Sequence, residues 1–84
     1  MQNHNLEIKD LLIDILESDQ TDIQSIEADE NLVESGLTSL KAISLVILIE
    51  EKFNIVLEDE DLLFENINSI SKINIIINKY LVNT

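Results

Sequence analysis

Residues 32–53 read LVESGLTSLKAISLVILIEEKF, and this stretch decides the fold. Its β-branched residues would suit a strand, but the sixteen residues from Thr38 to Phe53 contain no turn signal, whereas strands usually span about 3–10 residues. We therefore predict a helix over 38–53, with the Thr38 hydroxyl as its N-cap. The face expected to point into the core carries Leu45, Val46, Ile49 and Phe53, flanked by Ile43 and Leu48.

The residues on either side of this helix carry the signals of its ends. Residues 18–35 are rich in polar side chains and are predicted to form a long loop. Isolated apolar residues would anchor this loop to the core: Ile23, Ile26, Leu32 and Val33. Gly36, the only glycine, closes the loop, where its freedom to adopt a positive φ allows a sharp turn. After the helix, Asn54 fits a C-terminal cap in the left-handed region.

Apolar residues at helical spacing predict two further long helices, one near each end of the chain. Residues 5–17 place Ile8, Leu11, Leu12, Ile15 and Leu16 on one face. Ser69 is a suitable N-cap for a last helix, whose inner face would carry Ile70, Ile73, Ile76, Ile77, Tyr80 and Leu81.

Between the second and last helices, residues 55–58 are predicted to be extended and residues 59–64 to form a short helix of one or two turns. The sequence thus predicts an all-α fold, a four-helix bundle within a single domain over residues 1–84. Three helices would be longer and the third one short, with a long loop between helices one and two.

The charge of the chain limits its partners. Seventeen acidic residues against five basic ones give a formal net charge of −12, which would repel nucleic acid and anionic lipid surfaces. The same charge would attract basic protein surfaces, although solubility alone would explain it equally well. No apolar run is long enough to span a bilayer, and residues 1–10 do not resemble a secretory signal. We therefore expect a soluble, cytoplasmic, monomeric protein.

The residues that ordinary catalysis needs are scarce. The chain has no cysteine and one histidine, His4, which we expect on the surface of a frayed terminus. A Ser-His-Asp triad would depend on this one residue, and a metal site with two histidine ligands cannot form. The carboxylates are interpreted as solvated. Residues 58–61 (EDED) do not begin a calcium loop, because positions six and twelve counted from Asp59 are Phe64 and Ile70. We predict neither enzyme activity nor a dedicated metal site.

The segment Gly36-Leu37-Thr38-Ser39-Leu40 resembles the Gly-x-Asp-Ser-Leu motif of the acyl and peptidyl carrier proteins of fatty acid, polyketide and nonribosomal peptide assembly. The resemblance continues through Glu50, Glu51, Phe53, Asn54 and Ile55. It implies that Ser39 receives 4′-phosphopantetheine from coenzyme A. Without these neighbours Ser39 would be interpreted as an ordinary serine at a helix start.

The implied attachment site is physically reasonable, because the first turn of a helix offers free N–H groups and a positive dipole end to a phosphodiester. The expected cofactor site around Ser39 also includes Gly36, Thr38 and Leu40. Gly36 would keep the approach to the Ser39 hydroxyl uncrowded. The expected partner-binding residues are Leu40, Lys41, Ser44, Ile47, Glu50 and Glu51. Thr38 stands where the family usually has Asp. Fatty acid carriers tend to be acidic at the positions of Lys41 and Ser44, and the pattern Ser-Leu-Lys-Ala-Ile at 39–43 looks more like that of polyketide or nonribosomal peptide carriers.

The resemblance implies a free-standing carrier that holds acyl or aminoacyl groups as thioesters and shuttles them between biosynthetic enzymes. Its partners would be a phosphopantetheinyl transferase, a loading enzyme for acyl or aminoacyl groups, and ketosynthase, condensation or tailoring enzymes. The alternative is a carrier-like acidic helical module that binds other proteins without a prosthetic group. A carboxylate-dependent enzyme of unknown type is a third, more distant interpretation.

Overall fold

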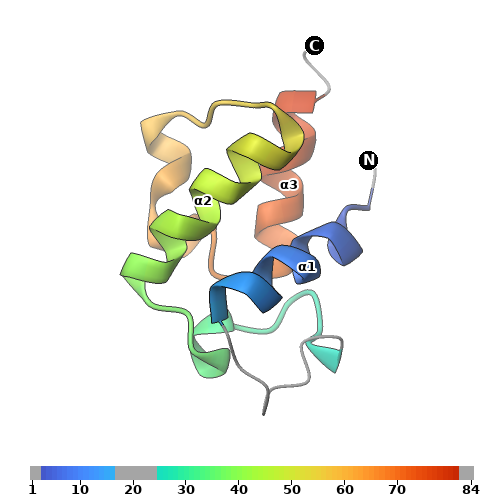
Figure 1. The fold of residues 1–84 in the computed structure, drawn as a ribbon, viewed down its shortest axis with the longest axis vertical. Coiled ribbons are helices and arrows are strands. Elements are labelled where there is room, and N and C mark those ends of the chain that lie inside the picture. The colour runs from blue at the N-terminus through green and yellow to red at the C-terminus, as the bar shows by residue number, and fades with distance from the viewer. Residues whose placement is uncertain (1–2, 17–24, 82–84) are drawn as a thin grey trace.

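The computed structural model describes residues 3–16 and 25–81, and within these ranges its regular secondary structure consists of helices alone (Figure 1). Its elements are the α-helices α1 (Asn5–Leu16), α2 (Ser39–Phe53) and α3 (Ile70–Leu81), and the 3-10 helices η2 (Leu32–Ser35), η3 (Asp59–Leu62) and η4 (Phe64–Asn66). The absence of strands in the described ranges confirms the all-α fold predicted from the sequence. The expected anchor Ile23 and the end of the first helix beyond Leu16 lie outside the described residues.

Both ends of α2 form as the sequence predicts. Thr38 is extended, and its Oγ1 accepts a hydrogen bond from the Lys41 N–H at 3.1 Å. Gly36 adopts φ +106°, and Asn54 adopts φ 55° and ψ 50° with its N–H donated to the Glu50 carbonyl. Local side-chain chemistry and two left-handed residues therefore fix where this helix begins and ends.

The core lies where α2 and α3 each pack against α1. The predicted inner residues of α2 are buried at Leu45, Val46 and Ile49, while Phe53 and Leu48 are partly buried. Ile43 was predicted to flank the core, and this was wrong, because 59% of its surface is exposed. Ala42, which the sequence analysis did not assign, is buried instead.

The inner faces of the other two α-helices are confirmed. Helix α1 buries Ile8, Leu11, Leu12 and Leu16, with Ile15 partly buried. Helix α3 buries Ile70, Ile73, Ile76 and Ile77, with Tyr80 and Leu81 partly buried. Ser69 caps α3 as predicted, since its Oγ accepts the Lys72 N–H at 3.2 Å.

The loop before α2 is fastened to α3 rather than free. Ile26 and Leu32 are buried as predicted, and Leu32 N–H donates to the Asn68 carbonyl at 2.8 Å. The Ser71 N–H donates to the Ala28 carbonyl at the same distance, 2.8 Å. Val33 was predicted to be a further anchor, but it is 46% exposed, because the 3-10 helix η2 turns it outward.

The short third helix takes the form of two 3-10 helices. After α2 the chain turns and returns alongside that helix as η3 and η4 before α3 begins (Figure 1). Leu63 separates the two with an extended backbone (φ −65°, ψ 135°), which prevents a continuous helix. This segment forms one wall of the site described below.

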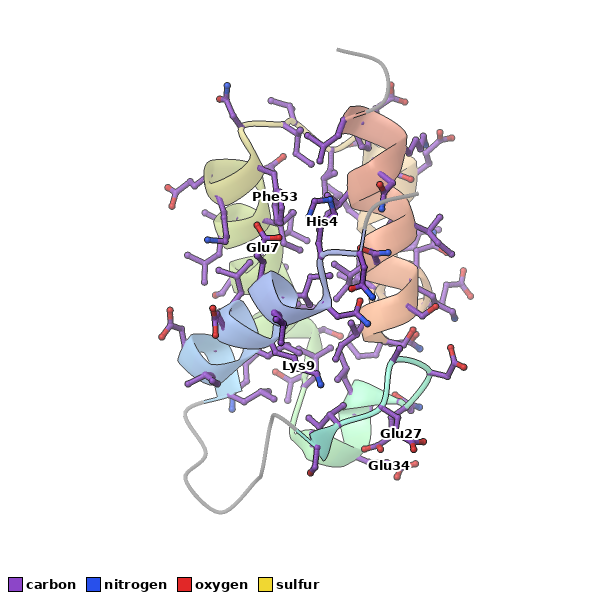
Figure 2. The ribbon with its side chains drawn as sticks, turned by 90° about the vertical axis from the view of Figure 1, so that its right-hand side faces the viewer. His4, Glu7, Lys9, Glu27, Glu34 and Phe53 are labelled. Carbon is purple, nitrogen blue, oxygen red and sulfur yellow. The ribbon has the colours of Figure 1, made fainter. Side chains whose placement is uncertain are left out.

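His4 is not the exposed terminal residue that the sequence suggested. Its ring is buried and meets Phe53 edge to face, with centroids 5.1 Å apart (Figure 2). Nδ1 lies 3.0 Å from Glu7 Oε1, and the backbone N–H donates to Asn74 Oδ1 at 2.9 Å. Nε2 is buried without a hydrogen-bond partner in the described structure. His4 thus joins the start of α1 to both other α-helices.

Candidate functional site

Ser39 is the first residue of α2 and is exposed. The first hydrogen bond into the helix runs from the Ala42 N–H to the Thr38 carbonyl at 2.8 Å, and Thr38 Oγ1 occupies the Lys41 N–H. The N–H groups of Ser39 and Leu40 come before these bonds and belong to the turn that an α-helix leaves without internal acceptors. Together with the positive end of the helix dipole, they favour an anion attached to Ser39.

Gly36 sets the direction from which the chain enters this turn. Its N–H donates to the Val33 carbonyl at 3.1 Å, closing η2. A Cβ added to Gly36 would meet only Leu16 Cδ2, at 4.0 Å, so space does not demand glycine. The positive φ of 106° is what favours glycine, because the backbone of a residue with a side chain is strained in this region. The contribution of Gly36 to the site is therefore its backbone conformation.

A cavity of about 300 Å³ opens beside Ser39, and we call it the Ser39 cavity. Helix α2 contributes a stripe at spacings of three and four, Ser39, Ala42, Ile43 and Val46, and the opposite wall consists of Leu62, Leu63, Phe64 and Ile67. Apart from Ser39, every side chain of this lining is apolar. The volume is at the lower end of the range of about 300–1,000 Å³ for small-molecule sites. The arrangement suits an apolar chain tethered next to it.

This cavity was not predicted from the sequence. Ile43 was predicted to flank the core, and the triplet Leu62-Leu63-Phe64 was not assigned to any site. Two signals were present: the small Ala42 three residues after Ser39, and an apolar triplet directly after four consecutive acidic residues. Neither shows which surfaces face each other, so the cavity follows only from the packing of η3 and η4 against α2.

The predicted partner-binding residues divide into two groups. Leu40, which is 76% exposed, Lys41 and Ser44 border a groove between α1 and α2 that also contains Asp14, and the exposed Ile47 follows one turn along. Glu50 and Glu51 lie eleven and twelve residues after Ser39, a rise of about 16–18 Å along the helix. Glu51 is exposed, whereas Glu50 is half-buried and its Oε2 accepts the Leu57 N–H at 2.9 Å.

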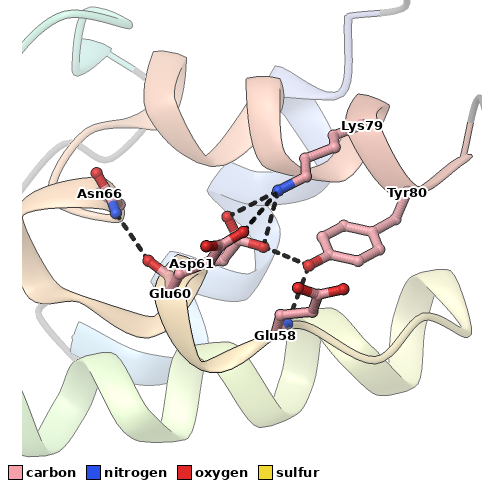
Figure 3. Close-up of polar contacts among 6 residues, drawn as sticks. All are labelled: Glu58, Glu60, Asp61, Asn66, Lys79 and Tyr80. Carbon is pink, nitrogen blue, oxygen red and sulfur yellow. Dashed lines mark hydrogen bonds and ion pairs between the residues drawn. The ribbon is translucent and has the colours of Figure 1, made fainter.

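The carboxylate of Asp61 departs most clearly from the prediction that the acidic residues are simply solvated. Asp61 is only 7% exposed, and the Tyr80 hydroxyl donates a hydrogen bond to its Oδ2 (Figure 3). Lys79 Nζ lies 3.2 Å from both carboxylate oxygens. Burial and the hydrogen bond to Asp61 raise the pKa of Tyr80, and the hydrogen bond to Asp61 raises the pKa of Lys79. We call Asp61, Lys79 and Tyr80 the Asp61 cluster.

Two other features are absent from the described residues. No group of three or more His, Asp or Glu side chains there is placed to hold a metal ion. None of the helices described is both long enough and apolar enough to cross a membrane.

Ser39 is thus exposed at the capped start of α2, beside an apolar cavity. A family model described as the phosphopantetheine attachment site matches residues 7–73, which is most of the chain. The chain therefore belongs to the phosphopantetheine-binding carrier family, and its prosthetic group is 4′-phosphopantetheine. As such a carrier it interacts with a phosphopantetheinyl transferase and with biosynthetic enzymes. No curated protein and no solved structure matches the chain.

Proposed function

We propose that the protein is a carrier whose Ser39 hydroxyl bears 4′-phosphopantetheine and which shuttles thioester-bound intermediates between enzymes. The observation that carries this proposal is the position of Ser39. It is exposed on the first turn of α2, it lies within the region matched by the family model, and it borders the Ser39 cavity. When bound, the prosthetic group supplies the thiol that holds the cargo as a thioester.

The residues of the chain contribute binding and orientation. The N–H groups of Ser39 and Leu40 stabilise the negative charge of the phosphodiester, and Thr38 keeps this turn helical by capping Lys41. Bond chemistry belongs to the partner enzymes, and the carrier raises the effective concentration of the cargo at their active sites. The protein itself is therefore not an enzyme in this proposal.

The Ser39 cavity indicates the class of cargo. Its side chains carry no charge, and the one polar group among them is the Ser39 hydroxyl. A charged aminoacyl group would lose its hydration there without finding a partner, which is unfavourable. An acyl chain would instead gain from leaving water. We therefore favour short apolar acyl groups over charged aminoacyl groups as the cargo.

Docking of partner enzymes is expected at the start of α2. Leu40 and Ile47 offer exposed apolar contact, and Lys41 and Ser44 border them. Lys41 is the only charged side chain between Ser39 and Ile49. The acidic Glu50 and Glu51 lie further along the helix, where their charge attracts basic partner surfaces. Such an interface is small and lets the carrier dissociate after each transfer.

The test is to incubate the protein with coenzyme A and a broad-specificity phosphopantetheinyl transferase and then to measure its intact mass. The wild-type chain should gain one phosphopantetheine. Ser39→Ala should gain nothing, whereas Ser71→Ala, which removes a hydroxyl from α3, should gain as much as wild type. An unmodified wild type, or an equal gain in Ser39→Ala, would contradict the proposal and favour an interaction module without a prosthetic group.

A further inference from the structure

The wall of the Ser39 cavity that lies opposite α2 consists of Leu62, Leu63, Phe64 and Ile67, and we call it the outer wall. Most of it belongs to segments that are too short to be stable on their own. Helices η3 and η4 have four and three residues, and helices of this length gain little stability from their own hydrogen bonds. Leu62 and Leu63 are 40% and 52% exposed, so burial fixes them only in part. Contacts with another element must therefore position this wall.

The Asp61 cluster supplies such contacts at one end of the wall. Asp61 directly precedes Leu62, and both of its oxygens lie 3.2 Å from Lys79 Nζ on α3. The Tyr80 hydroxyl donates to Asp61 and accepts the Glu58 N–H at 2.9 Å, so one phenol holds both ends of the first turn of η3 (Figure 3). Lys79 also lies 5.3 Å from the centre of the Tyr80 ring.

A second lysine of α3 holds the other end. Lys72 Nζ donates to the Glu65 carbonyl at 2.8 Å, and Asn66 Nδ2 donates to the Glu60 carbonyl at 3.1 Å. Two of the five lysines in a chain of net charge −12 therefore bind this one segment. The residues between the two attachments, Leu62 to Phe64, face α2 across the cavity, together with Ile67 just beyond them.

We propose that the Asp61 cluster positions the outer wall of the Ser39 cavity and thereby determines whether the cavity encloses an apolar cargo. Asp61, Lys79 and Tyr80 are positioning residues, because they act through Leu62 and Leu63 and none of them lines the cavity. Burial also raises the pKa of Tyr80, in agreement with a hydroxyl held in its protonated, donating form. The part of this inference that concerns the cargo rests on the proposed function. The part that concerns the position of the wall does not.

The structural part is tested on the unmodified chain by hydrogen exchange. Tyr80→Phe removes the hydroxyl and keeps the ring, and it should raise the exchange of amides 58–66 relative to those of α2 by about fivefold or more, the factor expected from losing one net hydrogen bond. Lys79→Met is a second variant with the same expected effect. Ile73→Val is the control, because it weakens the core of α3 and leaves the cluster intact. Unchanged relative exchange in both cluster variants would overturn the inference, whether or not Ser39 is modified.

The cargo part is tested on the loaded chain by cleavage of the thioester with neutral hydroxylamine. An octanoyl thioester should be cleaved several-fold faster in Tyr80→Phe than in wild type, because the displaced wall no longer shields it. An acetyl thioester, which is too short to need the cavity, should be cleaved equally in both. Equal octanoyl cleavage in the two proteins, or the same acceleration in Ile73→Val, would contradict the positioning role. A wild-type chain that cannot be loaded at Ser39 would instead refute the proposed function.

Discussion

Replacing Thr38 with alanine should destabilise the turn that carries Ser39. Thr38 Oγ1 accepts the Lys41 N–H at 3.1 Å, and alanine would leave that donor without its acceptor. Loss of a threonine N-cap costs about 1 kcal/mol, within a range of about 0.5–2 kcal/mol. Thr38 is exposed, so little packing is lost in addition. For a domain of this size we expect Tm to fall by about 4–8 °C.

The assay is thermal and urea unfolding followed by circular dichroism, with two companion variants. Thr38→Asp should be at least as stable as wild type, because aspartate caps well and its charge interacts favourably with the helix dipole. Ser44→Ala changes an exposed hydroxyl of the same helix and should stay within about 0.5 kcal/mol of wild type. If Thr38→Ala unfolds at the wild-type temperature, the cap does not hold the start of α2 and the reasoning fails.

Three further predictions concern the whole fold. The pKa of Tyr80 is raised above 10.0 in the folded protein, so the stability that its protonated hydroxyl contributes is present below pH 10 and lost above it. The Tm should therefore fall above pH 10, and it should fall less in Tyr80→Phe. Because the net charge is −12, moderate salt or millimolar magnesium should raise Tm at neutral pH, and a flat Tm across salt would contradict this. Leu45→Ala, at a fully buried position, should lower the free energy of unfolding in urea by about 2–5 kcal/mol. Ile47→Ala, at an exposed position, should lower it by about 0.5 kcal/mol or less. Similar losses in the two variants would mean that the faces of α2 are misassigned.

The features that were predicted correctly from the sequence depend on neighbours along the chain. The positive φ of Gly36, the cap at Thr38 and the left-handed Asn54 each follow from the chemistry of one residue and its place beside an apolar run. The inner faces of α1 and α3 follow from spacings of three and four, which set one face of any helix. These local signals are enough to place Ser39 at the start of α2.

The features that were missed depend on contacts between distant segments. His4 is buried because Asn74 and Phe53, far along the chain, meet it. Asp61 differs from its acidic neighbours only because Lys79 and Tyr80 lie opposite it, eighteen and nineteen residues later.

The exposure of Ile43 was missed for a similar reason, since helical periodicity shows a direction but not whether an element covers that face. For Ile43 the packing leaves a cavity there instead of filling the space. The placement of Ser39 at the exposed start of α2 was thus predictable from the sequence, whereas the cavity beside it was not.

The most direct test of the account is the intact mass of the protein purified from its native host, followed by fragmentation to locate any added group. We predict that the chain carries 4′-phosphopantetheine and that fragmentation places it on Ser39. A native protein without the group, or one that carries it on a different residue, would contradict the central claim.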